Sequence, residues 1–339
     1  MNLETGPLFD RIIQGDRVAL GRAMTLVESE RSEDRDTAID LLALCEEKVR
    51  GMSPSLRLTI SGAPGAGKST LIETLGLRAI EKGHKVGVIT VDPSSSLSHG
   101  SILGDKSRMT GLSTSNDAFI RSSPAGHVLG GLGRRSLELM TLLETAGFNL
   151  ILVETVGVGQ SEHTAWQLTD GFILVVQPGA GDELQGIKRG ITELADLVII
   201  NKADGDLKEL ARVTRSHYTN ALHYFSGIRE GWTPATYTCS ALEGTGLDKV
   251  LEGIHDYQRN LMQSGRWSAE RNKQKLAWLH WSLGMTAHEL FMNHPVIRNK
   301  MERAIHDVSE TVAPLYKTAY QIESAMAALI QSQGSHSEI

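Results

Sequence analysis

The stretch that decides the fold of this chain reads Gly62-Ala63-Pro64-Gly65-Ala66-Gly67-Lys68-Ser69-Thr70. Its first eight residues match the phosphate-binding loop pattern G-x-x-x-x-G-K-[ST] at every fixed position. The apolar run Leu56–Ser61 before it predicts a buried strand, and residues 70–82 after it have helical composition. Glycines allow backbone N–H groups to turn towards an anion, and the helix start adds a partial positive charge. We therefore expect Lys68 to contact the β- and γ-phosphates of a nucleotide and Ser69 to bind Mg²⁺.

A second motif, Asn201-Lys202-Ala203-Asp204, follows a predicted strand at 196–200. An aspartate carboxylate at this position accepts hydrogen bonds from both the ring N–H and the amino group of guanine, a pair of donors that adenine lacks. Behind a phosphate-binding loop, the motif predicts GTP rather than ATP as substrate and GDP as product. The loop Ser240-Ala241-Leu242 after a predicted strand at 235–239 is suited to backbone contact with the base, or is a plain strand-to-loop turn.

Two carboxylates close predicted strands of the same sheet. Asp92 ends the strand 86–91, and Glu154 ends the strand 150–153. Because the carboxyl ends of parallel strands meet at one edge, we expect both to face the phosphate site. There they would hold Mg²⁺ directly or through water, or orient the attacking water; the alternative is a solvated strand-end acid or a helix cap. Asp105, in the loop 101–109, is a candidate for a further metal or water contact.

Loop cations are the remaining candidates. Lys106 and Arg108 could neutralise charge in the transition state, or be ordinary surface cations. The glycine-rich segment 177–188 also follows a strand and predicts a mobile loop, with Lys188 able to reach a phosphate or a partner. A simple connecting loop explains that segment equally well.

The composition of the chain restricts the class of protein to which it can belong. The chain has 339 residues, 40% of them hydrophobic, with a net charge of -6 and a pI near 6.1. This acidic balance argues against nucleic-acid partners. Cys45 and Cys239 are too few for a disulfide framework, and no apolar stretch is long enough to span a bilayer. We expect a cytoplasmic protein without a membrane partner.

The pattern of elements predicts three regions. Residues 1–52 read as a helical N-terminal arm, and residues 263–339 as a helical C-terminal region without strands. Between them, residues 53–262 alternate apolar runs, such as 85–91, 149–154 and 171–177, with helical patterns. This alternation predicts an α/β fold with a mainly parallel sheet flanked by helices. The apolar stripes of the C-terminal region must cover either the core or a second copy of the chain.

These motifs together resemble the MeaB/ArgK group of P-loop GTPases, which are relatives of the metallochaperone GTPases. The resemblance covers nearly the whole chain and rests on the phosphate-binding loop, 91–95, 100–109, 153–161 and the guanine motif. Glu154-Thr155-Val156-Gly157 is similar to the family's variant of the Walker B region, with glutamate in place of the usual aspartate. The segment 96–99 departs from the family, which is often richer in proline and threonine there.

The resemblance implies a GTPase chaperone for a cobalamin-dependent acyl-CoA mutase, usually methylmalonyl-CoA mutase. Similar proteins form homodimers through their C-terminal helices and use GTP to gate delivery of adenosylcobalamin and to eject damaged cofactor. The adenosyltransferase is a further candidate partner. By the same resemblance, Lys68, Ser69, Asp92, Asp105 and Glu154 belong to the phosphate and Mg²⁺ site. Asn201 and Asp204 belong to guanine recognition, and the segment 177–188 corresponds to a switch that senses the partner.

Other functions fit the sequence less well. A metallochaperone GTPase typically carries a His-rich tract or a Cys-x-Cys-Cys-like motif, whereas the histidines here are scattered and the cysteines isolated. A kinase acting on an amino-acid transport system would need a site for a phosphoacceptor protein, which a sequence cannot show. A targeting GTPase would need a Met-rich groove, and the methionines are dispersed.

Overall fold

The computed structural model describes residues 5–92, 109–124, 135–155, 161–179, 189–223, 231–309 and 314–334. The contacts between Cα atoms divide the chain into two compact units, Met1–Lys275 and Leu276–Ile339. The first unit contains the sheet and the residues around it, and the second contains helices only.

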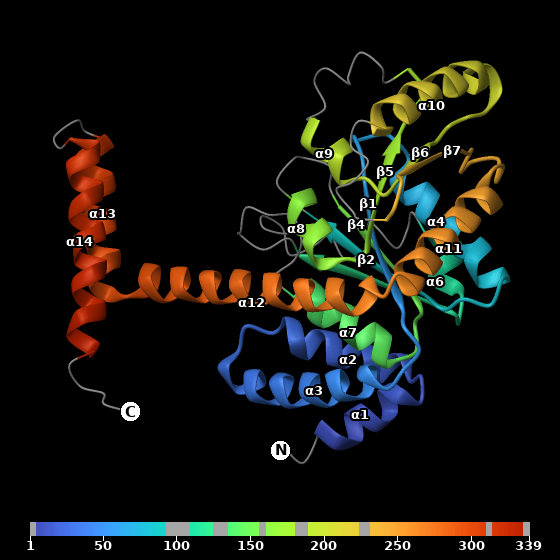
Figure 1. Cartoon of the computed structure of the whole chain (residues 1–339). Helices are drawn as coiled ribbons and strands as arrows, with labels where there is room; N and C mark the ends of the chain where they lie inside the picture. Colours follow the sequence, from blue (N-terminus) through green and yellow to red (C-terminus); the bar gives the residue numbers. More distant parts are fainter. Residues whose placement is uncertain are drawn as a thin grey trace. The chain divides into compact units, whose positions relative to one another are not determined.

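A seven-stranded sheet forms the centre of the first unit (Figure 1). Its strands are β1 (Leu56–Ser61), β2 (Val86–Asp92), β3 (Ala118–Pro124), β4 (Leu150–Glu154), β5 (Gly171–Val176), β6 (Leu197–Ile200) and β7 (Ala235–Thr238). They lie in the order β3-β2-β4-β1-β5-β6-β7, and every neighbouring pair is parallel. The predicted α/β class with a parallel sheet flanked by helices is confirmed.

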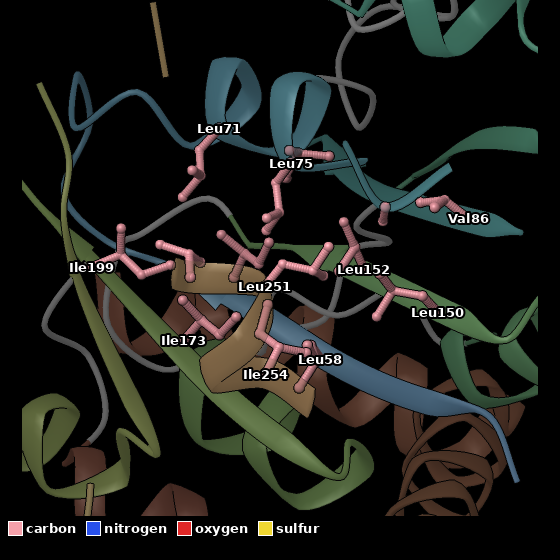
Figure 2. Close-up of a cluster of buried hydrophobic side chains, with 14 of the residues drawn as sticks. Leu58, Leu71, Leu75, Val86, Leu150, Leu152, Ile173, Ile199, Leu251 and Ile254 are labelled. Carbon is pink, nitrogen blue, oxygen red and sulfur yellow. The ribbon is translucent and has the colours of Figure 1, made fainter. Parts of the chain in front are cut away.

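One face of the sheet packs against α4 (Lys68–Glu81), α6 (Thr110–Thr114) and α11 (Leu247–Gln263). Figure 2 shows the core on this face, where side chains of α4 and α11 meet those of the central strands. Leu71 and Leu75 of α4 and Leu251 of α11 are fully buried there. Because helices cover both faces, all six residues of β1 are buried, the polar Arg57, Thr59 and Ser61 as well as the apolar residues that alternate with them.

The opposite face of the sheet is covered by α8 (Ser161–Leu168), α9 (Arg189–Leu194), α10 (Lys208–His223) and α7 (Ser136–Thr145). Phe172, Leu174 and Val176 of β5 alternate towards this side and join the second core cluster with Tyr218 of α10. The sheet is therefore the middle of three layers, and its loops are free to meet at the carboxyl ends of the strands.

The N-terminal arm consists of α1 (Thr5–Ile13), α2 (Arg17–Glu28) and α3 (Ser32–Arg50), which pack on one another and on α7. Asp16 caps α2, accepting hydrogen bonds from the backbone N–H groups of Val18 and Ala19. Arg17 donates to the carbonyls of Asn116 and Ala118 at 3.0 and 2.5 Å. The arm therefore contacts the beginning of β3, the outermost strand on that side of the sheet.

The helix α12 (Arg266–Asn293) begins in the first unit, and α13 (Pro295–Ser309) and α14 (Leu315–Gly334) follow in the second. Within the second unit, α13 and α14 pack against each other. Large apolar side chains of this unit are more than half exposed, namely Leu276, Leu283, Leu290, Ile305, Leu315, Tyr316 and Tyr320. Among the helices that the structure describes, none combines the length and apolar character needed to cross a membrane.

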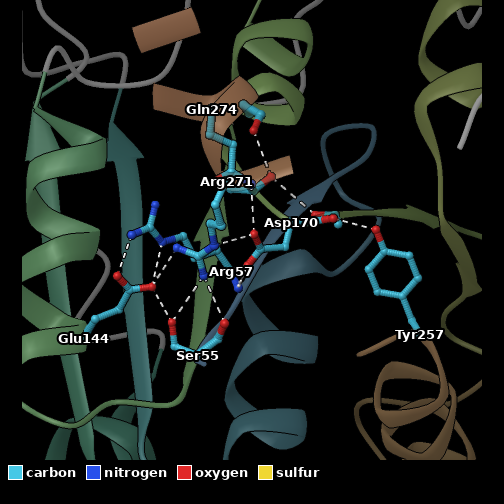
Figure 3. A network of polar contacts seen from close by, with 10 residues as sticks. Ser55, Arg57, Glu144, Asp170, Tyr257, Arg271 and Gln274 are labelled. Carbon is cyan, nitrogen blue, oxygen red and sulfur yellow. Dashed lines mark hydrogen bonds and ion pairs between the residues drawn. The ribbon is translucent and has the colours of Figure 1, made fainter. Parts of the chain in front are cut away.

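A buried network of charges joins the start of α12 to the sheet (Figure 3). Arg57 of β1 and Arg271 of α12 both pair with Glu144 of α7, at 2.5 and 2.9 Å. Arg271 also pairs with Asp170 at 2.8 Å, whose other contacts include the backbone N–H of Arg57 and the side-chain amide of Gln274. Glu144 is only 3% exposed, so its charge depends on these partners.

We expect Glu144→Gln to destabilise the fold at neutral pH and to weaken its pH dependence. Burial opposes ionisation of Glu144, but the pairs with Arg57 and Arg271 outweigh it and lower the pKa of Glu144 to about 2 from 4.5. Its contribution is therefore complete above pH 4.5 and is lost as pH falls from there towards 2. Removing one member of a buried charge network costs about 3–5 kcal/mol.

Thermal unfolding followed by circular dichroism at pH values from 7 to 3 tests this expectation. The difference in Tm between the wild type and Glu144→Gln should be largest at pH 7 and shrink below pH 4.5. Glu47→Gln, on the exposed face of α3, is the matched control and should track the wild type at every pH. A Tm difference that stays constant over this range would show that the charge of Glu144 does not stabilise the fold.

Candidate functional site

The loop between β1 and α4 can be built only with glycine at two positions. Gly62 has a φ of +152°, and a Cβ there would lie 2.1 Å from the carbonyl oxygen of Val175. Gly67 has a φ of +86°, and a Cβ there would lie 2.6 Å from Nδ2 of Asn201. At both positions the backbone conformation and the neighbouring atoms exclude any side chain. Glycine therefore allows the loop its tight path around the start of α4.

Lys68 is the first residue of α4 and extends back over this loop. Its Nζ donates to the carbonyl oxygens of Gly62 and Ala63, at 2.8 and 3.3 Å. The side chain is buried, and burial lowers the pKa of Lys68, while the charges of Glu154 and Glu162 oppose that shift. The ammonium group is thus held inside the loop, where an anionic ligand of the loop would meet it. Pro64, Gly65 and Thr70 are exposed around it.

Ser69 and Glu154 are brought together although 85 positions separate them. The Ser69 hydroxyl donates to Oε1 of Glu154 at 2.8 Å. Glu154 ends β4, which is paired with β1 on one side and with β2 on the other. Asp92 ends β2 at the same edge of the sheet, and the structure describes its backbone position only. Asp105, Lys106, Arg108 and Lys188 lie outside the described residues.

The oxygens at this edge fit a magnesium ion. Ser69 and Glu154 offer a hydroxyl and a carboxylate, the hard ligands that Mg²⁺ takes while keeping several waters. Two neighbouring hydroxyls, those of Ser61 and Thr155, are buried and have no hydrogen-bond partner among the described residues. Ser61 directly precedes the loop and Thr155 directly follows Glu154, so polar groups remain available where the ion and its waters would lie.

Asn201 connects the phosphate-binding loop to the second motif. Its Nδ2 donates to the carbonyl of Ala66 at 3.0 Å, and its Oδ1 accepts the backbone N–H of Ala241 at 3.0 Å. The thiol of Cys239 also donates to this oxygen at 3.7 Å, and burial raises the pKa of Cys239 to about 12, so the thiol keeps its proton. Asn201 is therefore a positioning residue, which holds three loops together.

Asp204 lies at the open end of this arrangement. It precedes the short helix η4 (Gly205–Leu207), and its side chain makes no capping hydrogen bond to that helix. Instead, the Ser240 hydroxyl donates to Oδ2 of Asp204. Lys202, two residues before Asp204, has a positive φ of 57°. It turns the chain so that Asn201 and Asp204 contact different partners. Leu242 is 84% exposed beside them, and Ala241 is buried.

Glu162 is a site residue that the sequence analysis missed. It lies in the first turn of α8 and is 1% exposed. Its negative charge acts to raise the pKa of Lys68, against the effect of burial. The signal in the sequence was an acidic residue at a helix start just after the glycine-rich segment 157–159. Acidic side chains are common at such positions because they interact favourably with the helix dipole. The sequence gives no sign that this carboxylate is buried near the loop.

A parallel sheet, a phosphate-binding loop that opens α4, a carboxylate beside its serine and an Asn-Lys-x-Asp loop at the same edge define a P-loop GTPase. The family model described as "Methylmalonyl Co-A mutase-associated GTPase MeaB" matches residues 20–294. The chain belongs to this family. It hydrolyses GTP.

Named relatives agree with this assignment. The chain is 46% identical to a "Putative GTPase" of Caulobacter vibrioides, over 83% of this chain and 85% of the relative. It is 45% identical to "GTPase ArgK" of Escherichia coli, over 79% and 80%, and 42% identical to the "Methylmalonic aciduria type A homolog, mitochondrial" of Mus musculus, over 88% and 74%. A crystal structure titled "LAO/AO transport system kinase" matches with a TM-score of 0.74 at 33% identity, covering 96% of this chain and 99% of that one.

We expect Glu154→Gln to reduce GTP hydrolysis by about 10²-fold and to raise the Mg²⁺ concentration needed for half-maximal rate. Glutamine keeps the contact to Ser69 but removes the negative charge that attracts the metal ion. Measurement of kcat over a Mg²⁺ titration tests this, with Glu81→Gln at the exposed end of α4 as control. An unchanged Mg²⁺ dependence in Glu154→Gln would remove this residue from the metal site.

Proposed function

We propose that this GTPase is a chaperone of a cobalamin-dependent acyl-CoA mutase, with methylmalonyl-CoA mutase as the first candidate. In this proposal, binding and hydrolysis of GTP gate the delivery of adenosylcobalamin to the mutase and protect or reactivate the loaded enzyme. The observation that carries it is the match of the mutase-associated family model to residues 20–294, and the contacts of Ser69 with Glu154 and of Asn201 with Ala66 support it. The adenosyltransferase is a further candidate partner.

The described residues support a sequence of roles in hydrolysis. Lys68 would exchange the carbonyls of Gly62 and Ala63 for phosphate oxygens and stabilise the charge on the transferred group. Ser69 and Glu154, with Asp92, would hold Mg²⁺, which neutralises phosphate charge when bound. Asp204 would accept the guanine hydrogen bonds, with Ser240 holding its carboxylate and Ala241 and Leu242 lining the base. Lys202, beside Gly67, would cover the nucleotide from the other side.

Slow turnover by the free protein is part of the proposal. Among the described residues no arginine hydrogen-bonds or ion-pairs with the loop 62–69, whereas Lys68 hydrogen-bonds to it. We therefore expect the free protein to hydrolyse GTP on the order of 10⁻⁴ to 10⁻² per second. Asp105 and Lys188 are proposed to act from the loops 101–109 and 177–188, the second of which we propose as the segment that senses the mutase.

The proposed organisation has three parts: the arm 1–52, the GTPase domain 53–262 and a dimerisation region 263–339. The exposed apolar side chains of the second unit support a homodimer, because water-exposed leucines and tyrosines at this density are typical of association surfaces. We propose the cytoplasm as its location, because both cysteines, Cys45 and Cys239, are free and buried.

The test is the GTPase rate with and without purified methylmalonyl-CoA mutase, in the presence and absence of adenosylcobalamin, with ATP as the control nucleotide. The proposal predicts an increase that requires the mutase and GTP. If the mutase changes neither the rate nor the affinity for GTP, methylmalonyl-CoA mutase is not the client. Other cobalamin-dependent acyl-CoA mutases then become the candidates, and failure with all of them would overturn the chaperone role while leaving the GTPase intact.

A further inference from the structure

Two histidines from distant parts of the chain meet on the side of the sheet away from the nucleotide. His84 lies in the loop between α4 and β2, and His255 lies on α11. Their Nε2 atoms are 3.0 Å apart, and their ring centroids are 5.0 Å apart with an angle of 30° between the planes. His84 precedes the start of a strand, whereas the phosphate-binding loop follows the end of one, so the pair belongs to the opposite edge of the sheet.

The protonation of His84 follows from its other nitrogen. Oδ1 of Asn149 accepts the backbone N–H of Lys85 at 3.1 Å, which identifies this atom as the oxygen of the amide. Nδ1 of His84 lies 3.2 Å from the same oxygen, so Nδ1 carries the proton and donates to it. With the proton on Nδ1, the neutral form of the ring has its lone pair on Nε2, the atom that faces His255.

This arrangement is the one found around metal-ligating histidines. Such a histidine usually donates its second ring N–H to an oxygen acceptor, which fixes the tautomer and the orientation of the ring. Asn149 performs that role for His84. Two nitrogens 3.0 Å apart also match neighbouring ligands of one ion, because metal–nitrogen bonds of about 2.0–2.1 Å would then enclose an angle of about 95°.

A neighbouring hollow gives an ion access to His255. A hollow of about 510 Å³ lies beside the pair, lined by Glu252, His255, Asp256 and Arg259. The cations nearest to His255 each have a carboxylate partner: Lys82 lies 3.0 Å from Asp248, and Arg259 pairs with Asp256. Both histidines are half-buried and so partly shielded from water, and His255 lines the hollow.

We propose that His84 and His255 form a binding site for a divalent transition-metal ion of the borderline class, such as Cu²⁺, Ni²⁺ or Zn²⁺. Imidazole nitrogen suits these ions, whereas Mg²⁺ prefers oxygen. The part of the chain that the structure describes holds no group of three metal-ligating side chains, so water completes the coordination and the site is open on the side of the hollow. Without the ion, the two rings share one hydrogen bond.

Isothermal titration with Cu²⁺ tests the proposal on the full-length protein, with GDP and Mg²⁺ saturating the nucleotide site. The wild type should bind one more Cu²⁺ equivalent than the double variant His84→Gln/His255→Gln. Asn149→Ala should keep that equivalent but weaken its binding about 10-fold or more, since it removes only the orienting contact. His280→Gln, an exposed histidine of the second unit, is the matched control and should leave the equivalent unchanged.

Electron paramagnetic resonance of the wild type with one Cu²⁺ equivalent provides a readout that needs no variant. Hyperfine coupling to two imidazole nitrogens is expected. A spectrum without two nitrogen ligands would overturn the proposal, as would equal Cu²⁺ stoichiometry in the wild type and a folded double variant. Either outcome would leave the pair as a hydrogen bond that joins α11 to the loop before β2, and neither would affect the GTPase assignment.

Discussion

Lys68→Ala is expected to abolish measurable GTP hydrolysis, with a fall in kcat of at least about 10²–10³-fold. The ammonium group of Lys68 is buried within the loop and is held by the carbonyls of Gly62 and Ala63, close to where the phosphates would lie. Removing it withdraws charge from the transferred phosphoryl group at the point where negative charge has to be stabilised. A single-turnover assay with radiolabelled GTP measures a rate this low.

The control for Lys68→Ala is Lys48→Ala, which removes the same charge from an exposed position on α3. It should hydrolyse GTP at the rate of the wild type. Thermal unfolding should show that Lys68→Ala remains folded, because the removed side chain extends over the phosphate-binding loop and is not part of the apolar core. Hydrolysis by folded Lys68→Ala at more than a tenth of the wild-type rate would show that the chemistry is performed elsewhere.

Asp204→Asn is expected to lower the affinity for GTP by about 10²–10³-fold and to favour xanthosine triphosphate. Each hydrogen bond from guanine to the carboxylate is worth about 1.5–3 kcal/mol, and asparagine presents one donor where guanine requires two acceptors. Xanthine carries an oxygen in place of the amino group, so it offers one donor and one acceptor, which match the amide. The side chain of Asp204 is available for this role because it does not cap η4.

Competition binding against a fluorescent guanine nucleotide measures these affinities for GTP, ATP and xanthosine triphosphate. Asp206→Asn, two residues further along in η4, makes the same chemical change at an exposed position and should retain the preference of the wild type. If Asp204→Asn still selects GTP over xanthosine triphosphate, base recognition does not depend on this carboxylate.

The sequence predicted six of the seven strands, including β7 at one edge of the sheet, and missed β3 at the other edge. The predicted strand Leu56–Ser61 is the observed β1, in which apolar residues alternate with Arg57, Thr59 and Ser61, and all six residues are buried. The edge strand β3 has the sequence Ala118-Phe119-Ile120-Arg121-Ser122-Ser123-Pro124, whose second half is polar. It pairs with β2 alone and needs no continuous apolar pattern, so hydrophobicity did not indicate it.

The sequence predicted those parts of the site that lie in recognisable motifs or at the ends of strands. The phosphate-binding loop and the carboxylate Glu154 could be placed at one edge by topology alone. The contacts that join them depend on side chains meeting across 85 to 135 positions, as in Ser69 with Glu154 or Asn201 with Ala66. The amide of Asn201 contacts the carbonyl of Ala66 and the backbone N–H of Ala241, and its part in guanine recognition stays a prediction. A tetrapeptide pattern cannot distinguish a residue that contacts the base from one that positions the contact.

The contact between α2 and β3 gives the N-terminal arm a role at the edge of the sheet. An outermost strand presents unpaired backbone groups to solvent, and Arg17 occupies two carbonyls at the start of β3 while Arg121 of that strand pairs with Glu28. Proteolysis that released the arm would leave this edge open to a strand from another molecule. The arm therefore covers this edge and protects it against aggregation. We expect a fragment that begins at Ser53 to precipitate while its nucleotide site is still intact.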